Sequence, residues 1–330
     1  MGMDVQQKLA TGVPGAKAWL KQAETVLANH SDRLDAINVF PVADGDTGTN
    51  LYETVKVAAQ AAHDIDNDSD VGLVLSAAAE AALEDARGNS GTLFSVFLVG
   101  FAEPLIGQPR LNLSLLAESL DRGQLRSWSA LTDPVRGTML TAMSAASEAV
   151  FASLQEAEVS AEPQSRAALL RGLENSIEAT RIAVAQSEAE LDTLAAAHVV
   201  DAGAVGFLLV LEAMKAAIAG TDVAEEVLDG FPGYGIQDPH VHRTVPAEEG
   251  VEVMCSMSLS PLDAALLRAQ LDDVGESVII SALPGGEDDE ARWRIHVHVP
   301  EQETTLSLLR TYGSPENVSV TTLSASESCA

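Results

Sequence analysis

Two carboxylates separated by a single glycine are the most informative feature of this chain. Asp44 and Asp46 stand in the segment N-V-F-P-V-A-D-G-D-T-G-T-N, which runs from Asn38 to Asn50. Carboxylate oxygens hold hard divalent cations, and Mg²⁺ in phosphoryl-transfer sites is bound by one or two carboxylates together with substrate phosphates. The pattern therefore predicts a magnesium–nucleotide site, with Asp44 and Asp46 as metal ligands.

The residues that follow the second carboxylate suit phosphate binding. Glycine allows close approach of a ligand, and a helix that begins at Thr49 or Asn50 would direct free N–H groups at phosphate oxygens. The residues expected to line the phosphates are Thr47, Gly48, Thr49 and Asn50. Asp-Gly pairs also mark ordinary β-turns. An EF-hand is excluded because the twelfth position counted from Asp44 is Val55 and not glutamate.

Three further segments complete a pattern that resembles a known family. They are A-R-G-N-S-G at residues 86–91, P-V-R-G-T-M-L at 134–140 and V-V-D-A-G-A-V-G at 199–206. Together with the first segment they resemble the ATP-binding subunit of dihydroxyacetone kinase, and within that group the N-terminal part of bacterial fatty acid kinase. The resemblance extends to about residue 320. It implies an ATP- and Mg²⁺-dependent phosphotransferase.

The resemblance also implies roles for residues in these segments. Those residues are Asn89, Ser90 and Gly91 at the phosphates, Thr138 near the nucleotide, and Asp201 with Gly203 at the ribose or base. Structural interpretations stay open beside these roles. Serine and aspartate are common helix N-caps, which would explain Ser90 and Asp201, and a packing role would explain Thr138.

Four positions depart from the pattern of the relatives. In dihydroxyacetone kinases a third carboxylate precedes the aspartate pair, and Asn38 stands at the nearest position here, where its amide oxygen is a weaker Mg²⁺ ligand. Arg136 replaces a usual glutamate, and Asp85 and His198 each replace a usual glycine. Arg136 reverses a charge, which would alter substrate choice or nucleotide affinity.

A second group of chemically active residues lies near the C-terminus. In I-H-V-H the two imidazoles of His296 and His298 project to one face of a predicted strand. Cys255 lies in another predicted strand, and if the two strands are neighbours the thiol can meet both histidines. One thiolate and two imidazoles leave an open position, which is the pattern of a reactive zinc site. The resemblance supports this site, although a buried cysteine beside two strand histidines is also ordinary.

The remaining cysteine and histidines are weaker candidates for functional residues. We expect His240 and His242 to be exposed in a linker, His30 and His63 to lie at the surface or at helix ends, and Cys329 to be idle in the tail.

Hydrophobic periodicity divides the chain into two domains. Eight segments with helical period precede residue 225, and the resemblance implies that they form an antiparallel eight-helix barrel or bundle that binds ATP at one end. A Pro- and Gly-rich linker is expected at 226–250. The order β-α-β-β-α-β then predicts a small ferredoxin-like α+β domain at 251–330.

Composition narrows the classes of function. The formal net charge of -30 argues against a nucleic-acid or anionic-membrane binder, because both need a basic surface. The 2 cysteines cannot build a disulfide framework, and we see no confident membrane span, so a cytoplasmic location is expected.

By resemblance, the phosphoryl acceptor is a fatty acid carboxylate presented by a separate fatty-acid-binding protein, and the chain forms a homodimer through its second domain. Complete fatty acid kinases carry a further docking domain, which we expect to be a separate polypeptide or to lie outside a truncated form, unless the protein has another function. Two alternative functions stay open. These are a dihydroxyacetone-type kinase component that acts on a small hydroxylated metabolite, and a nucleotide-responsive regulator without catalysis.

Overall fold

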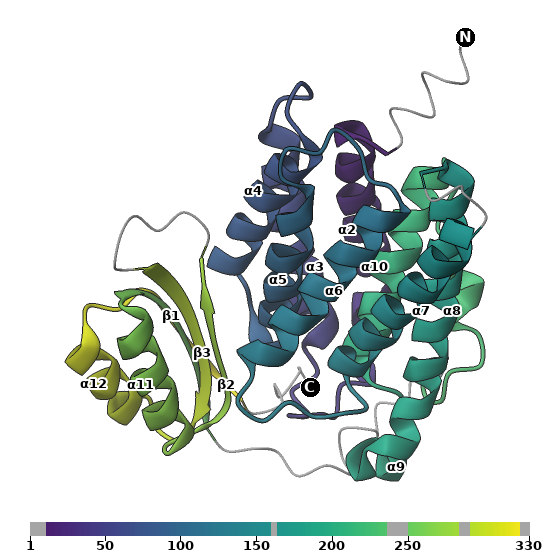
Figure 1. The fold of residues 1–330 in the computed structure, drawn as a ribbon. Coiled ribbons are helices and arrows are strands. Elements are labelled where there is room, and N and C mark those ends of the chain that lie inside the picture. Colours follow the sequence, from purple (N-terminus) through teal and green to yellow (C-terminus); the bar gives the residue numbers. More distant parts are fainter. Residues whose placement is uncertain (1–10, 160–163, 236–249, 284–290, 324–330) are drawn as a thin grey trace.

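The computed structural model describes residues 11–159, 164–235, 250–283 and 291–323. An all-helical domain comes first, and the sheet of a small α+β domain lies beside it (Figure 1). This arrangement confirms the predicted fold class.

Eight long helices within the described residues form the first domain, and polar caps begin several of them. The side chains of Asp70, Asn112, Ser165 and Asp201 each accept a hydrogen bond from the backbone N–H three residues later. The helices are α2 (Val13–Ala36), α3 (Thr47–Asp64), α4 (Val71–Glu84), α5 (Gly88–Ala102), α6 (Leu113–Ala130), α7 (Met139–Val159), α8 (Arg166–Glu190) and α10 (Ala202–Ala219). Shorter elements are η1 (Glu103–Leu105), α9 (Asp192–Ala197) and η2 (Glu225–Leu228).

The helical domain is closed by contact between its first and last described helices. Successive helices pack against one another, and α10 packs against both α8 and α2. The indole Nε1 of Trp19 in α2 donates a 3.0 Å hydrogen bond to the carbonyl of Val210 in α10. By length and composition alone α10 is apolar enough to cross a membrane, but it is buried as a core helix of this domain.

The second domain has the predicted ferredoxin-like topology. Its elements are β1 (Val251–Leu259), α11 (Pro261–Asp272), β2 (Glu276–Ala282), β3 (Ala291–Val299), α12 (Gln302–Tyr312) and β4 (Glu316–Thr322). The strands form an antiparallel sheet in the order β2-β3-β1-β4. Helices α11 and α12 cover one face of this sheet, and its other face is turned toward the helical domain (Figure 1).

Part of the expected linker packs against the helical domain. Leu228, Phe231 and Tyr234 are buried in the core of that domain. The Tyr234 hydroxyl lies 2.6 Å from Nδ1 of His30, which is only 2% exposed, so the expectation that His30 is a surface residue is wrong. His63 is exposed in the last turn of α3, as predicted. His240, His242 and Cys329 lie outside the described residues.

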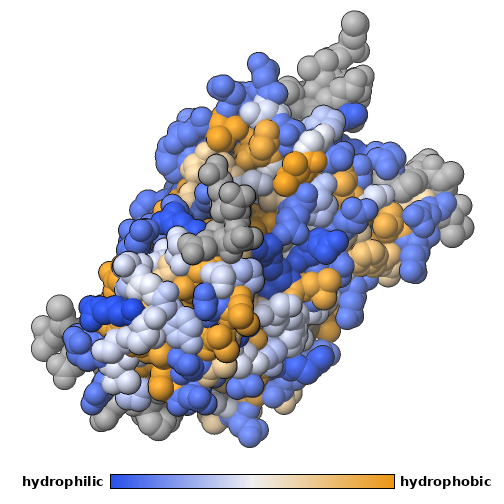
Figure 2. Space-filling view, turned by 60° about the vertical axis from the view of Figure 1, so that its left-hand side comes forward, coloured by the Kyte–Doolittle hydropathy of each residue, from blue (hydrophilic) through white to orange (hydrophobic). Residues whose placement is uncertain are grey.

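On the face shown in Figure 2, hydrophobic residues are scattered among hydrophilic ones. The most exposed large hydrophobic side chain among the described residues is Leu262 on α11, at 69%. A charge of -30 spread over such a surface favours solubility.

A close approach between α5 and α6 depends on Gly100. A Cβ at this position would lie 2.6 Å from the carbonyl oxygen of Arg122. We expect Gly100→Ala to lower the free energy of unfolding by roughly 1–2 kcal/mol, because overpacking outweighs the gain in helix propensity. Urea unfolding measures this difference. Gly235→Ala is the control, since nothing lies within 4 Å of its Cβ position. An unchanged midpoint for Gly100→Ala would contradict the predicted packing.

Candidate functional site

The Asp44–Asp46 turn is held in place by its own neighbours. Gly45 adopts φ +67°, a conformation that favours glycine, and α3 begins directly after Asp46. The amide Nδ2 of Asn38 donates to Oδ1 of Asp44 at 2.5 Å, and Oδ1 of Asn38 accepts from the Thr47 hydroxyl at 2.6 Å. Asn38 therefore holds the turn in place. Its Oδ1, which was expected to bind Mg²⁺, already accepts the hydrogen bond from Thr47.

The surroundings of both carboxyl groups disfavour their ionised forms. Burial, followed by the charge of Asp46, raises the pKa of Asp44 to about 8. Burial also raises the pKa of Asp46. Two partly buried carboxylates that repel one another are stabilised by a divalent cation between them, so this pair fits the predicted Mg²⁺.

The start of α3 differs from the prediction. The N–H groups of Gly48 and Thr49 do not point freely at a ligand, because both donate to Oδ1 of Asp35, at 2.6 and 3.1 Å. The Thr49 hydroxyl donates to Oδ2 of Asp35 at 2.7 Å, and the N–H of Asn50 donates to the Asp46 carbonyl at 2.8 Å. Sequence analysis missed Asp35 because it lies in the preceding helix, where no local motif marks it.

The second motif packs directly against the first. Helix α5 begins at Gly88, with φ +58°. A Cβ at Gly88 would lie 2.2 Å from Nδ2 of Asn50, so only glycine fits here. Ser90 lies within the first turn of α5 and not at its N-cap, and its hydroxyl donates to the Thr47 carbonyl at 3.2 Å. The structure thus brings Ser90 and Thr47 together and excludes the capping interpretation of Ser90.

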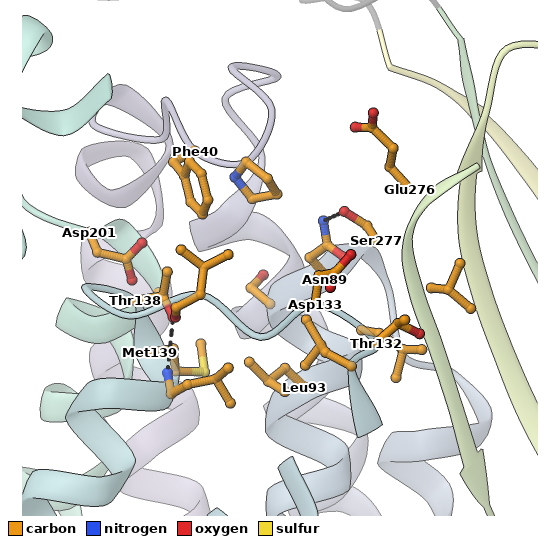
Figure 3. Close-up of a pocket in the computed structure, with 18 of the residues that line it drawn as sticks. Phe40, Asn89, Leu93, Thr132, Asp133, Thr138, Met139, Asp201, Glu276 and Ser277 are labelled. Carbon is orange, nitrogen blue, oxygen red and sulfur yellow. Dashed lines mark hydrogen bonds between the residues drawn. The ribbon is translucent and has the colours of Figure 1, made fainter. Parts of the chain in front are cut away.

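A cavity of about 490 Å³ opens beside these turns, between the two domains. Figure 3 shows Asp201, Thr138 and Phe40 on one side of it and Glu276 and Ser277 of β2 on the other. The helical domain also contributes to the lining with Thr47, Asn89, Ser90, Leu93, Met139 and Gly203. Polar groups at the turns and apolar side chains deeper inside suit a ligand with phosphates and a flat ring.

Three predicted residues in this cavity have identifiable partners. Nδ2 of Asn89 lies 3.5 Å from the Ser277 hydroxyl, whereas its Oδ1 is buried without a hydrogen-bond partner. The Thr138 hydroxyl donates to the Val135 carbonyl at 2.9 Å. Asp201 caps α10 by accepting from the Ala204 N–H at 2.7 Å, and burial raises its pKa to about 7. Asp201 therefore both caps α10 and lines the cavity.

The predicted meeting of Cys255 with the two histidines is wrong. Strands β1 and β3 are neighbours as expected, but Cys255 pairs with Ile295 and its thiol lies in the core beneath α11 and α12. His296 and His298 project from the opposite face, because side chains alternate along a strand. Burial raises the pKa of Cys255 to about 12, so the thiol is inert.

Glu252 takes the place expected for the thiol. It pairs with His298 across the strands, and its Oε1 lies 2.8 Å from Nε2 of His296 and 4.0 Å from Nε2 of His298. Candidate ligand atoms of these three buried residues all lie within 4.8 Å of one another. Burial would raise the pKa of Glu252, but the hydrogen bond with His296 and the proximity of His296, His298 and Arg294 outweigh it and lower the pKa.

The hydrogen bonds of His296 define what the cluster can hold. Nδ1 of His296 lies 3.0 Å from the carbonyl of Ser277 and must donate to it. Nε2 then faces the Glu252 carboxylate, and the close approach of two acceptors requires a proton or a cation between them. A carbonyl that orients the other ring nitrogen is the usual support of a metal-binding histidine.

The aspartate pair of the first domain and Glu252 with His298 of the second domain line one small hollow of about 20 Å³. It is lined by Asn38, Asp44, Asp46, Ser90, Glu252 and His298, among others. The negative charge of Glu252 contributes to the raised pKa of Asp46. The second domain therefore places its carboxylate and imidazole beside the candidate Mg²⁺ site.

Of the four departures from the relatives, Asn38 lies within the site and the other three do not line the cavity or the hollow. Arg136 and Asp85 are not among the residues that line the cavity, and Arg136 is exposed. His198 is exposed at the C-terminus of α9 with φ 53°, which explains why relatives use glycine there. The reversed charge of Arg136 thus acts from the surface.

The buried Asp201 predicts a pH dependence of stability. Its pKa is raised to about 7 in the folded protein, so folding favours the protonated form and stability falls as pH rises from about 4 to 7. Asp201→Asn keeps a capping side chain and removes the titration. We expect its unfolding free energy, measured by urea titration, to exceed that of the parent increasingly up to pH 7 and by a constant amount above. A pH-independent difference would contradict the assignment.

Comparison with known proteins agrees with this geometry. Residues 41–216, more than half of the 330-residue chain, match the DAK2 domain, and residues 250–328 match the FakA-like middle domain of fatty acid kinases. Protein YloV of Bacillus subtilis is 30% identical over 298 residues, which are 87% of this chain and 51% of that protein. An uncharacterized protein of Staphylococcus aureus (strain USA300) is 26% identical over 304 residues, with the same coverage of 87% and 51%.

The chain thus spans about half the length of these curated relatives. The crystal structure of the dihydroxyacetone kinase of C. freundii aligns with a TM-score of 0.41 and 19% identity, over 61% of this chain and 34% of that one. The match to the DAK2 domain covers Asp44, Asp46 and most of the helical side of the cavity, and the match to the middle domain covers the side formed by β2. The chain belongs to the DAK2-domain family and carries a FakA-like middle domain of the fatty acid kinase type.

Proposed function

We propose that the chain is an ATP- and Mg²⁺-dependent kinase module that acts in the cytoplasm. Its family is kinase-related, and the phosphoryl acceptor we propose is a fatty acid carboxylate presented by a separate fatty-acid-binding protein. The observation that carries the proposal is the pair of partly buried carboxylates of Asp44 and Asp46, which line a small hollow that shares Thr47, Asn89 and Ser90 with the 490 Å³ cavity. Family membership supports the same interpretation.

The residues of the chain divide the work of binding. Asp44 and Asp46 would hold Mg²⁺, which neutralises phosphate charge during transfer. The turn at Thr47 and Ser90 would position the phosphates, and the unpartnered Oδ1 of Asn89 offers a further polar contact. Apolar residues such as Leu93 and Met139 would hold the nucleotide base.

The acceptor we propose needs no general base, because a carboxylate is already ionised at neutral pH. The position of Glu252 in the hollow beside Asp44 and Asp46 favours a second candidate, a small hydroxylated metabolite, since a carboxylate can accept the proton of a hydroxyl. Incubation with ATP, Mg²⁺ and either a fatty acid with its binding protein or dihydroxyacetone, followed by detection of acyl phosphate or sugar phosphate, distinguishes the two. Transfer to neither acceptor, with ATP still bound, would favour a regulator without catalysis.

Asp46→Asn tests the metal site. We expect it to weaken Mg²⁺-dependent ATP binding at least tenfold, about 1.4 kcal/mol, in a calorimetric titration. Because the substitution removes one of two repelling charges, the metal-free variant should also be more stable than the parent above pH 8. Asp66→Asn, in an exposed turn, is the control. Unchanged ATP affinity in Asp46→Asn would remove the assignment.

We further propose that a metal ion, zinc by its ligand set of one carboxylate and two imidazoles, binds Glu252, His296 and His298. Glu252→Gln should lose the metal, measured by elemental analysis of the purified protein. Cys255→Ser should retain it, because the thiol lies on the other face of the sheet. If both variants retain the metal, or if the parent contains none, the assignment of a metal to these three residues is wrong. A proton would then lie between Glu252 and His296.

A further inference from the structure

The second domain contacts the segment of the helical domain that carries the phosphate-binding turn. We call residues 84–89 the α4–α5 segment. Arg292 of β3 forms an ion pair with Glu84, and Nη2 of Arg294 lies 3.5 Å from the carbonyl of Ala86. Ser277 of β2 meets Asn89, as described above. Alternate residues of β3 therefore follow the segment, and β2 meets it at the residue that precedes Ser90.

The opposite side of the α4–α5 segment rests on α3. Gly88 approaches the Asn50 side chain so closely that a methyl group would not fit, and Ser90 bonds to the Thr47 carbonyl. The segment is thus held between α3 and the sheet. A displacement of the sheet would free one of its two supports.

Arg294 is the central contact of this arrangement. Its side chain is 4% exposed, its Nε has no hydrogen-bond partner, and Nη1 reaches only the Ser256 hydroxyl, at 3.4 Å. A buried guanidinium with so few hydrogen bonds is unfavourable unless opposite charge surrounds it. Asp85 and Glu84 of the helical domain supply part of that charge. The helical domain therefore supplies part of the charge compensation of Arg294 while the two domains are docked.

A second set of contacts joins the domains on the far side of the cavity. Arg268 bridges the carbonyls of Ser129, at 3.0 Å, and Ile280, at 2.7 Å. Leu131 forms an isolated β-bridge with Ile279. Ser90 and Leu131 both line the cavity. The sheet therefore contacts the helical domain on two sides of the cavity, near Ser90 and at Leu131.

We propose that docking of the second domain holds the phosphate-binding turn in its binding conformation, with Arg294 as the positioning residue. This inference rests on the nucleotide site proposed above. Nucleotide binding and domain docking then strengthen each other by the same factor, because coupling between two equilibria is reciprocal. The second domain acts on the nucleotide through the α4–α5 segment, in addition to any metal that it holds.

The test compares Arg294→Gln and Arg294→Lys with the control Arg310→Gln on α12, on the far side of the sheet. Calorimetric titration with ADP and Mg²⁺ should show about tenfold weaker binding for Arg294→Gln, partial recovery for Arg294→Lys and parental affinity for the control. In the parent, ADP with Mg²⁺ should also slow hydrogen exchange of the β3 amides at 292–298. In Arg294→Gln this protection should be lost while circular dichroism is unchanged.

The outcomes separate this inference from the proposed function. No nucleotide binding by the parent overturns both. Parental affinity and full β3 protection in Arg294→Gln overturn the positioning role alone and leave the nucleotide site standing.

If Arg294→Gln misfolds, the same titration is made with variants of Arg292 and Glu84, which form a half-exposed ion pair. We expect Arg292→Gln and Glu84→Gln each to weaken binding about threefold, and the double variant to be no weaker than either single one. Parental affinity in both single variants overturns the inference, as do effects that multiply in the double variant.

Discussion

The repulsion between Asp44 and Asp46 is the constraint around which the site is built. Two carboxyl groups in a half-buried turn are unfavourable without a cation, so the surrounding chain must hold them there. Gly45 supplies the backbone conformation, the Asn38 amide donates to one carboxylate, and α3 begins directly behind the other. This unfavourable arrangement in the free protein is what a divalent cation would reverse.

The sheet of the second domain adds to this site through one of its faces only. The pairing of β1 with β3 places Glu252, His296, His298 and Arg294 toward the helical domain and leaves Cys255 in the opposite core. A shift of β1 by one residue against β3 would turn Cys255 toward the histidines and Glu252 into the opposite core. The register of a single strand pair thus determines whether a thiol or a carboxylate faces the aspartates.

The sequence was sufficient for features that depend on local patterns and insufficient for those that depend on contacts between distant segments. Helical period predicted the eight helices, and four motifs predicted the loops that meet at the cavity. No local signal shows that Asp35 accepts from Gly48, that Tyr234 covers His30, or that β2 closes the cavity. The strand register that separates Cys255 from the histidines likewise depends on packing across the sheet, not on spacing.

The bond between Trp19 and Val210 has a consequence for synthesis of the chain. Helix α2 cannot complete its packing until α10 has left the ribosome, and at about 5–20 residues per second the intervening chain takes roughly 10–40 s to make. During this time the apolar stripe of α2 is without its final neighbour. Because Asp201 opens α10 and lines the cavity, the helical side of the cavity is completed only when α10 docks, and a chain that stalls earlier would expose a long hydrophobic face to chaperones.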